Sequence, residues 1–173
     1  ALVVAALLGV VDMVTHDKID AINVEKTNQA LAAVAPEGAE FTPVELSDAA
    51  VSAAAAYGTL DSMYEMSTGG YAMKIVASGS QGSIEMIVGV DANKALTGVS
   101  VVNHSETGGI GTQVINNDPN SAGTPVLDQF IGMSGAGSLV VGKTVTPISG
   151  ATVTSKGITA GCNAALAAVE AMG

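Results

Sequence analysis

The sequence predicts an α+β domain in which an antiparallel sheet is flanked by helices, preceded by an N-terminal membrane-anchor helix. Three observations support this fold class. Four short β-rich runs follow one another between residues 60 and 104, and turn signals separate them. Ala-rich segments with helical spacing stand before and after these runs. With 173 residues, of which 48 % are hydrophobic and 13 % charged, the chain can bury the core of one domain.

The first element is an uncharged run, "ALVVAALLGVV", at residues 1–11. Because a bilayer span needs about 20 apolar residues, we expect residues 1–15 to be the outer part of an N-terminal transmembrane anchor. A buried core helix or the remnant of a signal peptide stay open as alternatives. The next segment, "DMVTHDKIDAINVEK", contains more acids than lysines, which fits a main domain on the extracytoplasmic side of the membrane.

Residues 16–58 are expected to form a helical stalk and a linker. The stretch "DKIDAINVEKTNQALAAVAP" predicts an amphipathic helix that ends before Pro36. Its apolar face is formed by Ile19, Ile22, Leu31 and Val34. "PEGAEFTPVE" resembles a turn-rich linker, and it precedes a short Ala-rich helix that Ser47 or Asp48 can cap.

Residues 59–173 are expected to form the main domain. The runs "LDSMYEM", "GYAMKIVAS", "GSIEMIVGVD" and "ALTGVSVVNH" predict antiparallel strands, because turns of hairpin length join them. A long loop rich in Gly, Asn and Ser follows from residue 105 to about 137, and "SLVVGKTVTP" predicts a further strand. The C-terminal segment predicts a helix with one apolar face, formed by Ile158, Cys162, Ala165, Leu166, Val169 and Met172.

Charge and composition exclude several classes of function. The net charge is −10 and the chain contains no arginine, which argues against nucleic-acid binding and removes the usual bidentate clamp for phosphate. The single cysteine, Cys162, lies on an apolar helical face and is expected to be a core residue. His16 and His104 are far apart in sequence, so no metal site or hydrolase triad is predicted.

Two local patterns resemble ligand loops but lack their context. "GSLVVGKT", at residues 137–144, matches the letters of a phosphate-binding P-loop. A P-loop needs a helix that starts at its lysine, and Pro147 stands where that helix would run. "VDANKALTG" carries Ala95 where a calcium loop needs an oxygen ligand, so we expect a hairpin turn there.

Five hydroxyl residues crowd the junction "TPISGATVTSKG", at residues 146–157, just before the last predicted helix. Unpaired amides and the macrodipole at a helix start attract anions. Thr154 or Ser155 could instead cap the helix, so the junction is either an anion site or a heavily capped helix start. The pair Gly150-Ala151 leaves room for a bulky group.

A second segment of interest is "NHSETGGIGTQV", at residues 103–114. Its three glycines in four positions allow the backbone to approach a flat or charged ligand closely. His104 and Glu106 precede the glycines at the end of a predicted strand. A plain glycine turn explains the same letters, and the residues alone leave both interpretations open.

Together, in this order and spacing, the two segments resemble the FMN-binding domain of membrane electron-transport flavoproteins. Ser149-Gly150-Ala151-Thr152 matches the family's S/T-G-A-T/S flavin-attachment motif, and residues 104–111 match its H-x-E-T-P-G-L-G signature. The resemblance spans about residues 60–172. Two positions depart from the pattern: Thr146 stands where many members carry an acidic residue that helps recognition by the flavin transferase, and Gly108 replaces the usual proline.

The resemblance implies that FMN is bound covalently, through a phosphoester to Thr152. It implies that Ser149, Thr154 and Ser155 offset the phosphate charge beside Gly150 and Ala151. It also implies that the flavin or its ribityl chain is lined by the second motif, with polar contacts from Glu106 and Thr107 and close backbone approach at Gly108, Gly109 and Gly111. The cofactor then does the redox chemistry, so no catalytic residue and no metal is expected.

Within the family, the short chain is most similar to the G subunits of Rnf complexes, which are ion-pumping ferredoxin:NAD oxidoreductases. This similarity implies a single-pass location in the cytoplasmic membrane and an electron-carrier role as a subunit of a translocase. It also implies three kinds of partner: other membrane subunits, a flavin transferase and the lipid bilayer. One alternative is the C subunit of the sodium-translocating NADH:quinone reductase, which is usually longer. The other is a non-redox binding or structural module outside the cytoplasm.

Overall fold

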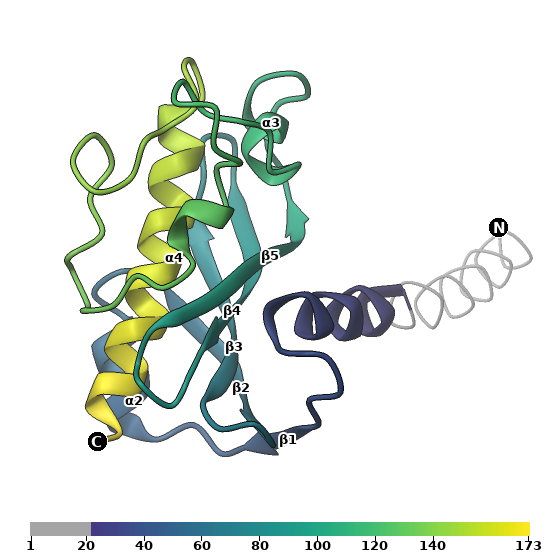
Figure 1. Cartoon of the computed structure of the whole chain (residues 1–173), viewed down its shortest axis with the longest axis vertical. Coiled ribbons are helices and arrows are strands. Elements are labelled where there is room, and N and C mark those ends of the chain that lie inside the picture. Colours follow the sequence, from purple (N-terminus) through teal and green to yellow (C-terminus); the bar gives the residue numbers. More distant parts are fainter. Residues whose placement is uncertain (1–21) are drawn as a thin grey trace, which may run out of the picture.

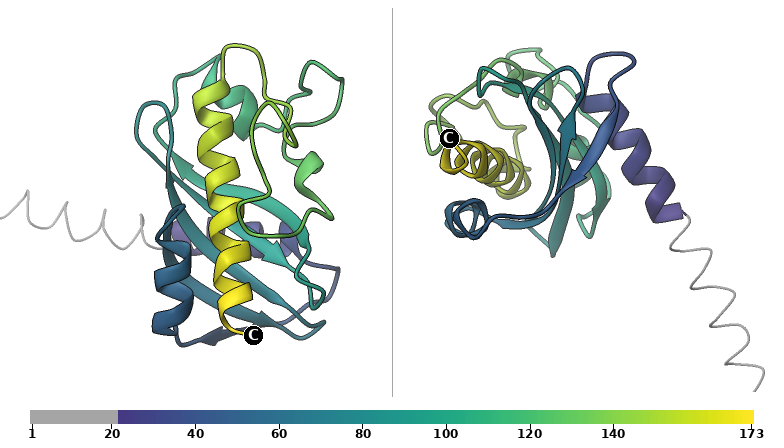
Figure 2. Two further views of the ribbon diagram at one scale, coloured as in Figure 1. Left: turned by 90° about the vertical axis from the view of Figure 1, so that its left-hand side faces the viewer. Right: turned by 90° about the horizontal axis from the view of Figure 1, so that it is seen from below.

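A computed structural model of the protein describes residues 22–173. The anchor predicted for residues 1–15 lies outside the described residues. Within them, an antiparallel sheet stands between helices on both faces, as Figures 1 and 2 show. The predicted α+β class is therefore confirmed for this part of the chain. No helix among residues 22–173 is long and apolar enough to cross a membrane.

The sheet has five strands, and each strand pairs only with its neighbours in sequence (Figure 1). The strands are β1 Phe41–Val44, β2 Thr59–Met66, β3 Tyr71–Ser78, β4 Ser83–Val90 and β5 Leu96–His104. All four pairings are antiparallel. The four predicted strands are confirmed, and β1 is an addition inside the stretch interpreted as a linker. This strand is short and contains Pro43, which an edge strand tolerates because one of its sides needs no ladder hydrogen bonds.

The turn between β4 and β5 is the hairpin that the sequence predicts in place of a calcium loop. The Asp91 carboxylate accepts hydrogen bonds from the amides of Asn93 at 2.8 Å and Ala95 at 3.0 Å. This carboxylate is occupied by its own turn, which is the usual role of an aspartate at this position.

One face of the sheet, here called the inner face, is covered by α2, Asp48–Ala54, and α4, Thr152–Ala171 (Figure 2). The Ser47 hydroxyl caps α2 by accepting from the amide of Ala50 at 3.2 Å, as predicted. The predicted apolar face of α4 is buried from Ile158 to Val169, with Met172 partly buried at its end. Cys162 is part of this core, and its burial raises the pKa of the thiol.

The opposite, outer face of the sheet carries the helix over residues 22–34 (Figure 2). Only its last turns are buried, through Ala30, Leu31 and Val34, whereas Ile22 is 54 % exposed. The helix ends before Pro36 as expected, and the Thr97 hydroxyl donates to the carbonyl of Val34 at 2.5 Å. The stretch expected as stalk and linker, residues 16–58, thus includes β1 and α2, and a domain boundary at residue 59 stays a prediction.

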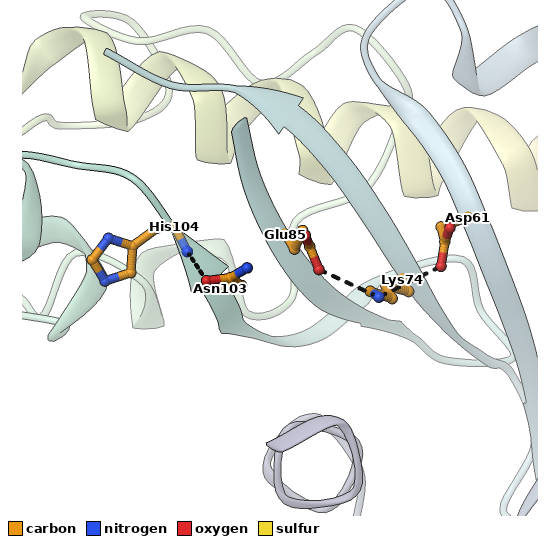
Figure 3. Close-up of polar contacts among 5 residues, drawn as sticks. All are labelled: Asp61, Lys74, Glu85, Asn103 and His104. Carbon is orange, nitrogen blue, oxygen red and sulfur yellow. Dashed lines mark hydrogen bonds and ion pairs between the residues drawn. The ribbon is translucent and has the colours of Figure 1, made fainter. Parts of the chain in front are cut away.

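Lys74 also lies on the outer face, in the middle of β3. Its ammonium group is 3.3 Å from the Glu85 carboxylate and 3.6 Å from the Asp61 carboxylate (Figure 3). All three side chains are partly open to solvent, so each pair contributes at most about 1 kcal/mol to the free energy of unfolding.

A long irregular connection leads from β5 to α4. Its regular secondary structure consists of two short helices, α3 at Gly111–Ile115 and η1 at Asp128–Phe130. The prediction of a strand at "SLVVGKTVTP" is wrong, because this segment folds back on itself. The amides of Lys143, Thr144 and Val145 all converge on the carbonyl of Val140. No helix starts at Lys143, since α4 begins only at Thr152, so the P-loop is excluded as expected.

Candidate functional site

The two motifs singled out in the sequence meet at one cavity of about 200 Å³. Three segments form its walls: the turn between β3 and β4, the glycine segment after β5, and the start of α4. The lining residues are Ser80, Gln81, Glu106, Thr107, Ile110, Gly111, Gly150, Ala151, Val153 and Thr154. The fold thus brings together three segments that are far apart in the sequence, at residues 80–81, 106–111 and 150–154.

Helix α4 begins beside this cavity without a side-chain cap. Ala151 is the N-cap residue, and no side chain within the described structure makes the capping hydrogen bond there. The first intrahelical bond runs from the amide of Ser155 to the carbonyl of Ala151 at 3.0 Å. The amides that precede Ser155 in the first turn have no carbonyl partner within the helix. The predicted capping by Thr154 or Ser155 is therefore wrong, and the first-turn amides of α4 donate no hydrogen bond to a capping side chain of the described residues.

Ser149 and Thr152 are exposed at this helix start, and so is Gly150, which has a φ of 84°. Thr152 is the first residue of α4. Its hydroxyl therefore lies on an accessible surface, next to residues that line the cavity on both sides in sequence. An exposed hydroxyl at a helix start is chemically suited to carry an anionic group such as a phosphoester.

Thr154 and Ser155 differ from these two because both are 1 % exposed. The Ser155 hydroxyl donates to the Ala151 carbonyl at 3.0 Å. The Thr154 hydroxyl donates to Oε2 of Glu106. Both hydroxyl protons are thus engaged inside the protein.

Glu106 is buried, with 7 % of its surface exposed. Its Oε1 accepts from the amides of Ser80 at 2.8 Å and Gln81 at 3.2 Å. Its own amide donates to Nδ1 of His104 at 3.2 Å, and the amide of His104 donates to Asn103 at 3.0 Å (Figure 3). The carboxylate therefore joins the segment after β5 to the turn between β3 and β4.

The glycine segment is divided between surface and interior. Thr107, Gly108 and Gly109 are exposed, and the amide of Gly109 donates to the Thr112 hydroxyl at 2.8 Å. Gly111 is buried and starts α3. Of the three predicted glycines, only Gly111 lines the cavity, whereas Gly108 and Gly109 lie in the exposed chain just before it.

Several residues of the site were missed in the sequence. Ser80 and Gln81 belong to a turn that precedes Glu106 by 26 and 25 residues, and no spacing rule connects this turn with Glu106. Ile110 and Val153 line the cavity although they are 52 % and 54 % exposed. The sequence did offer one signal for them: each is the apolar residue within an otherwise polar motif, Ile110 in the glycine segment and Val153 in the hydroxyl-rich segment. Lys156 is exposed four residues after Thr152, a separation that places two side chains on the same face of a helix.

The arrangement suits a phosphate-bearing organic cofactor better than a metal or a catalytic triad. No group of three metal-ligating side chains exists among residues 22–173. The cavity instead offers the first-turn amides of α4 and two exposed apolar side chains, which suit a nucleotide phosphate and a flat ring. Thr152 does not line the cavity, but it is exposed between the lining residues Ala151 and Val153.

Comparison with known proteins agrees with this class of site. A model of the family described as FMN-binding domain matches residues 79–167, just over half of the chain. The match begins at the turn between β3 and β4 and ends in α4, so it contains all three walls of the cavity. These features define a flavin-nucleotide-binding domain. The chain belongs to the FMN-binding domain family, and the resemblance drawn from its two motifs is confirmed at this level.

Two curated relatives are similar over most of the chain. One is the G subunit of the Na⁺-translocating ferredoxin:NAD⁺ oxidoreductase complex of Acetobacterium woodii, 29 % identical over 93 % of this chain and 82 % of the relative. The other is the G subunit of the ion-translocating oxidoreductase complex of Methanosarcina acetivorans, 29 % identical over 98 % of this chain and 88 % of the relative.

Proposed function

We propose that this protein is an electron-carrier subunit of an Rnf-type ion-translocating ferredoxin:NAD oxidoreductase complex and that it carries FMN covalently on Thr152. One observation supports the attachment site above all others. Thr152 is exposed at an uncapped helix start, between Ala151 and Val153, two residues that line the same cavity as the second motif. Both curated relatives are G subunits by name, which favours this assignment over the C subunit of the quinone reductase.

The proposed attachment is a group transfer without change of redox state. The Thr152 oxygen attacks the flavin-side phosphorus of a flavin pyrophosphate donor that the flavin transferase supplies. An O–P bond forms, the pyrophosphate bond breaks, and the hydroxyl proton leaves with the nucleotide phosphate. Thr152 has the property that this step needs, a hydroxyl that an external enzyme can reach.

The phosphate charge is stabilised mainly by backbone groups and one lysine. The free first-turn amides and the helix macrodipole favour an anion at Thr152. The Ser149 hydroxyl is exposed and adds a donor. Lys156 adds a positive charge one turn along the same helix face, in a chain that has no arginine. Thr154 and Ser155, predicted to offset this charge, contribute through their backbone, since their hydroxyl protons are engaged elsewhere.

The organic part of the cofactor is held by the surface around the cavity. Ile110 and Val153 provide apolar contact, and the exposed backbone at Gly108 and Gly109 leaves space beside it. When bound, FMN supplies the electron transfer, while the chain positions it and sets its environment. The protein itself needs no catalytic acid or base for this role.

The proposed location follows from the same assignment. Residues 1–15 anchor the chain in the cytoplasmic membrane, the main domain lies on the extracytoplasmic side, and electrons pass between neighbouring membrane subunits. A covalent bond suits such a location, because a flavin released outside the cytoplasm is not readily replaced. Both relatives are named as subunits of translocating complexes, which supports other membrane subunits as partners of this chain.

The test is co-expression with a flavin transferase, followed by a denaturing gel viewed under ultraviolet light. We expect a fluorescent band for the unchanged chain and for Thr152→Ser, which keeps an acceptor hydroxyl. Thr152→Val should give a dark band, while Ser149→Ala should remain fluorescent. A dark band for the unchanged chain would contradict the carrier role and favour the non-redox module. Persistent fluorescence of Thr152→Val would place the attachment elsewhere.

A further inference from the structure

We infer that Glu106 is a positioning residue that locks the three walls of the FMN cavity together and is not a ligand of the flavin. This inference rests on the proposed function for the meaning of the cavity. The lock itself consists of contacts within the protein. It assigns the buried carboxylate of the second motif a role different from the polar cofactor contact that the family resemblance implies.

The hydrogen bonds of the carboxylate reach two of the three walls. Oε1 accepts from Ser80 and Gln81 in the turn between β3 and β4. Oε2 accepts from the Thr154 hydroxyl in the first turn of α4. The backbone of Glu106 belongs to the third wall, the segment after β5. A carboxylate has about four lone-pair sites, and three of those of Glu106 already accept from protein donors, two at Oε1 and one at Oε2.

The backbone packs against this carboxylate from two sides. A Cβ atom added at Gly111 would lie 2.7 Å from Oε2 and 2.8 Å from Cβ of Glu106, closer than real side chains approach. A Cβ atom added at Gly79 would clash with Oε1. Glycine at these two positions therefore lets the chain close around the Glu106 side chain. By contrast, a Cβ atom at Gly108 would meet nothing within 4 Å.

The position of Thr152 depends on this lock. Thr154 follows the proposed acceptor by two residues, so the bond from Thr154 to Glu106 fixes the first turn of α4 against the glycine segment. The opposite oxygen fixes the turn between β3 and β4 against the same carboxylate. Without Glu106, two amides and one hydroxyl in the cavity wall lose their partner, which costs stability locally.

The decisive measurement is hydrogen exchange at the amides of Ser80 and Gln81 in the full chain without flavin. In Glu106→Ala we expect exchange at both amides to rise about tenfold, because their acceptor is gone. Gly111→Ala should raise it as well by displacing the carboxylate. Glu106→Gln keeps a carbonyl oxygen for both amides and should stay close to the unchanged chain. Gly108→Ala is the matched control, since its added methyl group meets open space.

The same variants are then co-expressed with the flavin transferase, and band fluorescence is measured. A positioning role predicts that Glu106→Gln is as fluorescent as the unchanged chain, whereas Glu106→Ala loses fluorescence. Unaltered exchange in Glu106→Ala and Gly111→Ala would overturn the inference. Normal exchange with lost band fluorescence in Glu106→Gln would also overturn it, because the carboxylate would then act on flavin loading without holding the walls. Because exchange is read without flavin, it stands even if Thr152 proves not to be the attachment site.

Discussion

The four hydroxyl residues around the start of α4 are of the same chemical types, but they differ in exposure and in hydrogen bonding. Ser149 and Thr152 are exposed, whereas Thr154 and Ser155 are each 1 % exposed and hydrogen-bonded inside the protein. A helix turns about 100° per residue, so Thr152 and Thr154 point to opposite sides. The comparison shows that the exposed Thr152 is available for chemistry, while the buried Thr154 holds the same turn against Glu106.

Replacing the buried threonine should have the largest effect on stability. Thr154→Val keeps the shape of the side chain but removes the donor to Glu106, which leaves one oxygen of a buried carboxylate without its protein partner. We expect the free energy of unfolding to fall by about 1–3 kcal/mol, measured by urea denaturation. An unchanged midpoint would show that the two sides of the turn do not differ as described.

Replacing the buried serine should have a smaller effect. Ser155→Ala removes the bond to the Ala151 carbonyl, but that carbonyl still accepts from the Ser155 amide. A loss of about 0.5–1 kcal/mol is expected from the same denaturation measurement. If Ser155→Ala instead lost its flavin at full stability, Ser155 would belong to the exposed, chemical side of the comparison.

Replacing the exposed threonine should affect flavin attachment and not stability. Thr152→Val should leave the free energy of unfolding of the unmodified chain within about 0.5 kcal/mol, because the side chain is exposed. Band fluorescence should nevertheless be lost. A destabilisation as large as that of Thr154→Val would mean that Thr152 is a structural residue of the turn.

The smallest effect is expected at Lys156, whose charge acts on the same exposed side. Lys156→Gln should leave stability unchanged and slow flavin attachment at low ionic strength, with the difference disappearing as salt screens the charge. The rate of fluorescence gain at two salt concentrations measures this. Lys26→Gln is the control, since Lys26 is an exposed lysine of the outer-face helix. Equal slowing in both variants would indicate only a general charge effect.

Much of the sheet could be predicted, because alternating apolar residues and turn signals are local properties of the chain. β2 to β5 were found in this way, and β1 was not, since four residues around Pro43 lack the pattern of a strand. "SLVVGKTVTP" has strand-forming residues, yet the Thr144 hydroxyl accepts from the Val140 amide and donates to the Ser138 carbonyl. Those contacts satisfy the backbone in a turn, and residue preferences do not reveal them.

The two motifs of the site could be predicted from the sequence, but the role of each hydroxyl within them could not. The letters around Thr152 mark a helix start rich in hydroxyls, but they do not say which hydroxyls face solvent. That depends on the rotation of α4 against the sheet, which the burial of Ile158 and Leu166 sets. The parts played by Ser80 and Gln81 depend on a contact across the fold, so they appear only once Glu106 is placed.

The meander of the sheet has a consequence for maturation. Every strand from β1 to β5, and the glycine segment after them, precedes α4 in the chain, so synthesis delivers two walls of the cavity before the third. Neighbouring antiparallel strands form through short loops and fold early, whereas α4 must return across the sheet from the end of a long connection. Thr152 is therefore synthesised after the other two walls, and we expect the proposed transferase, if it needs all three walls, to modify only chains in which α4 has docked on the sheet.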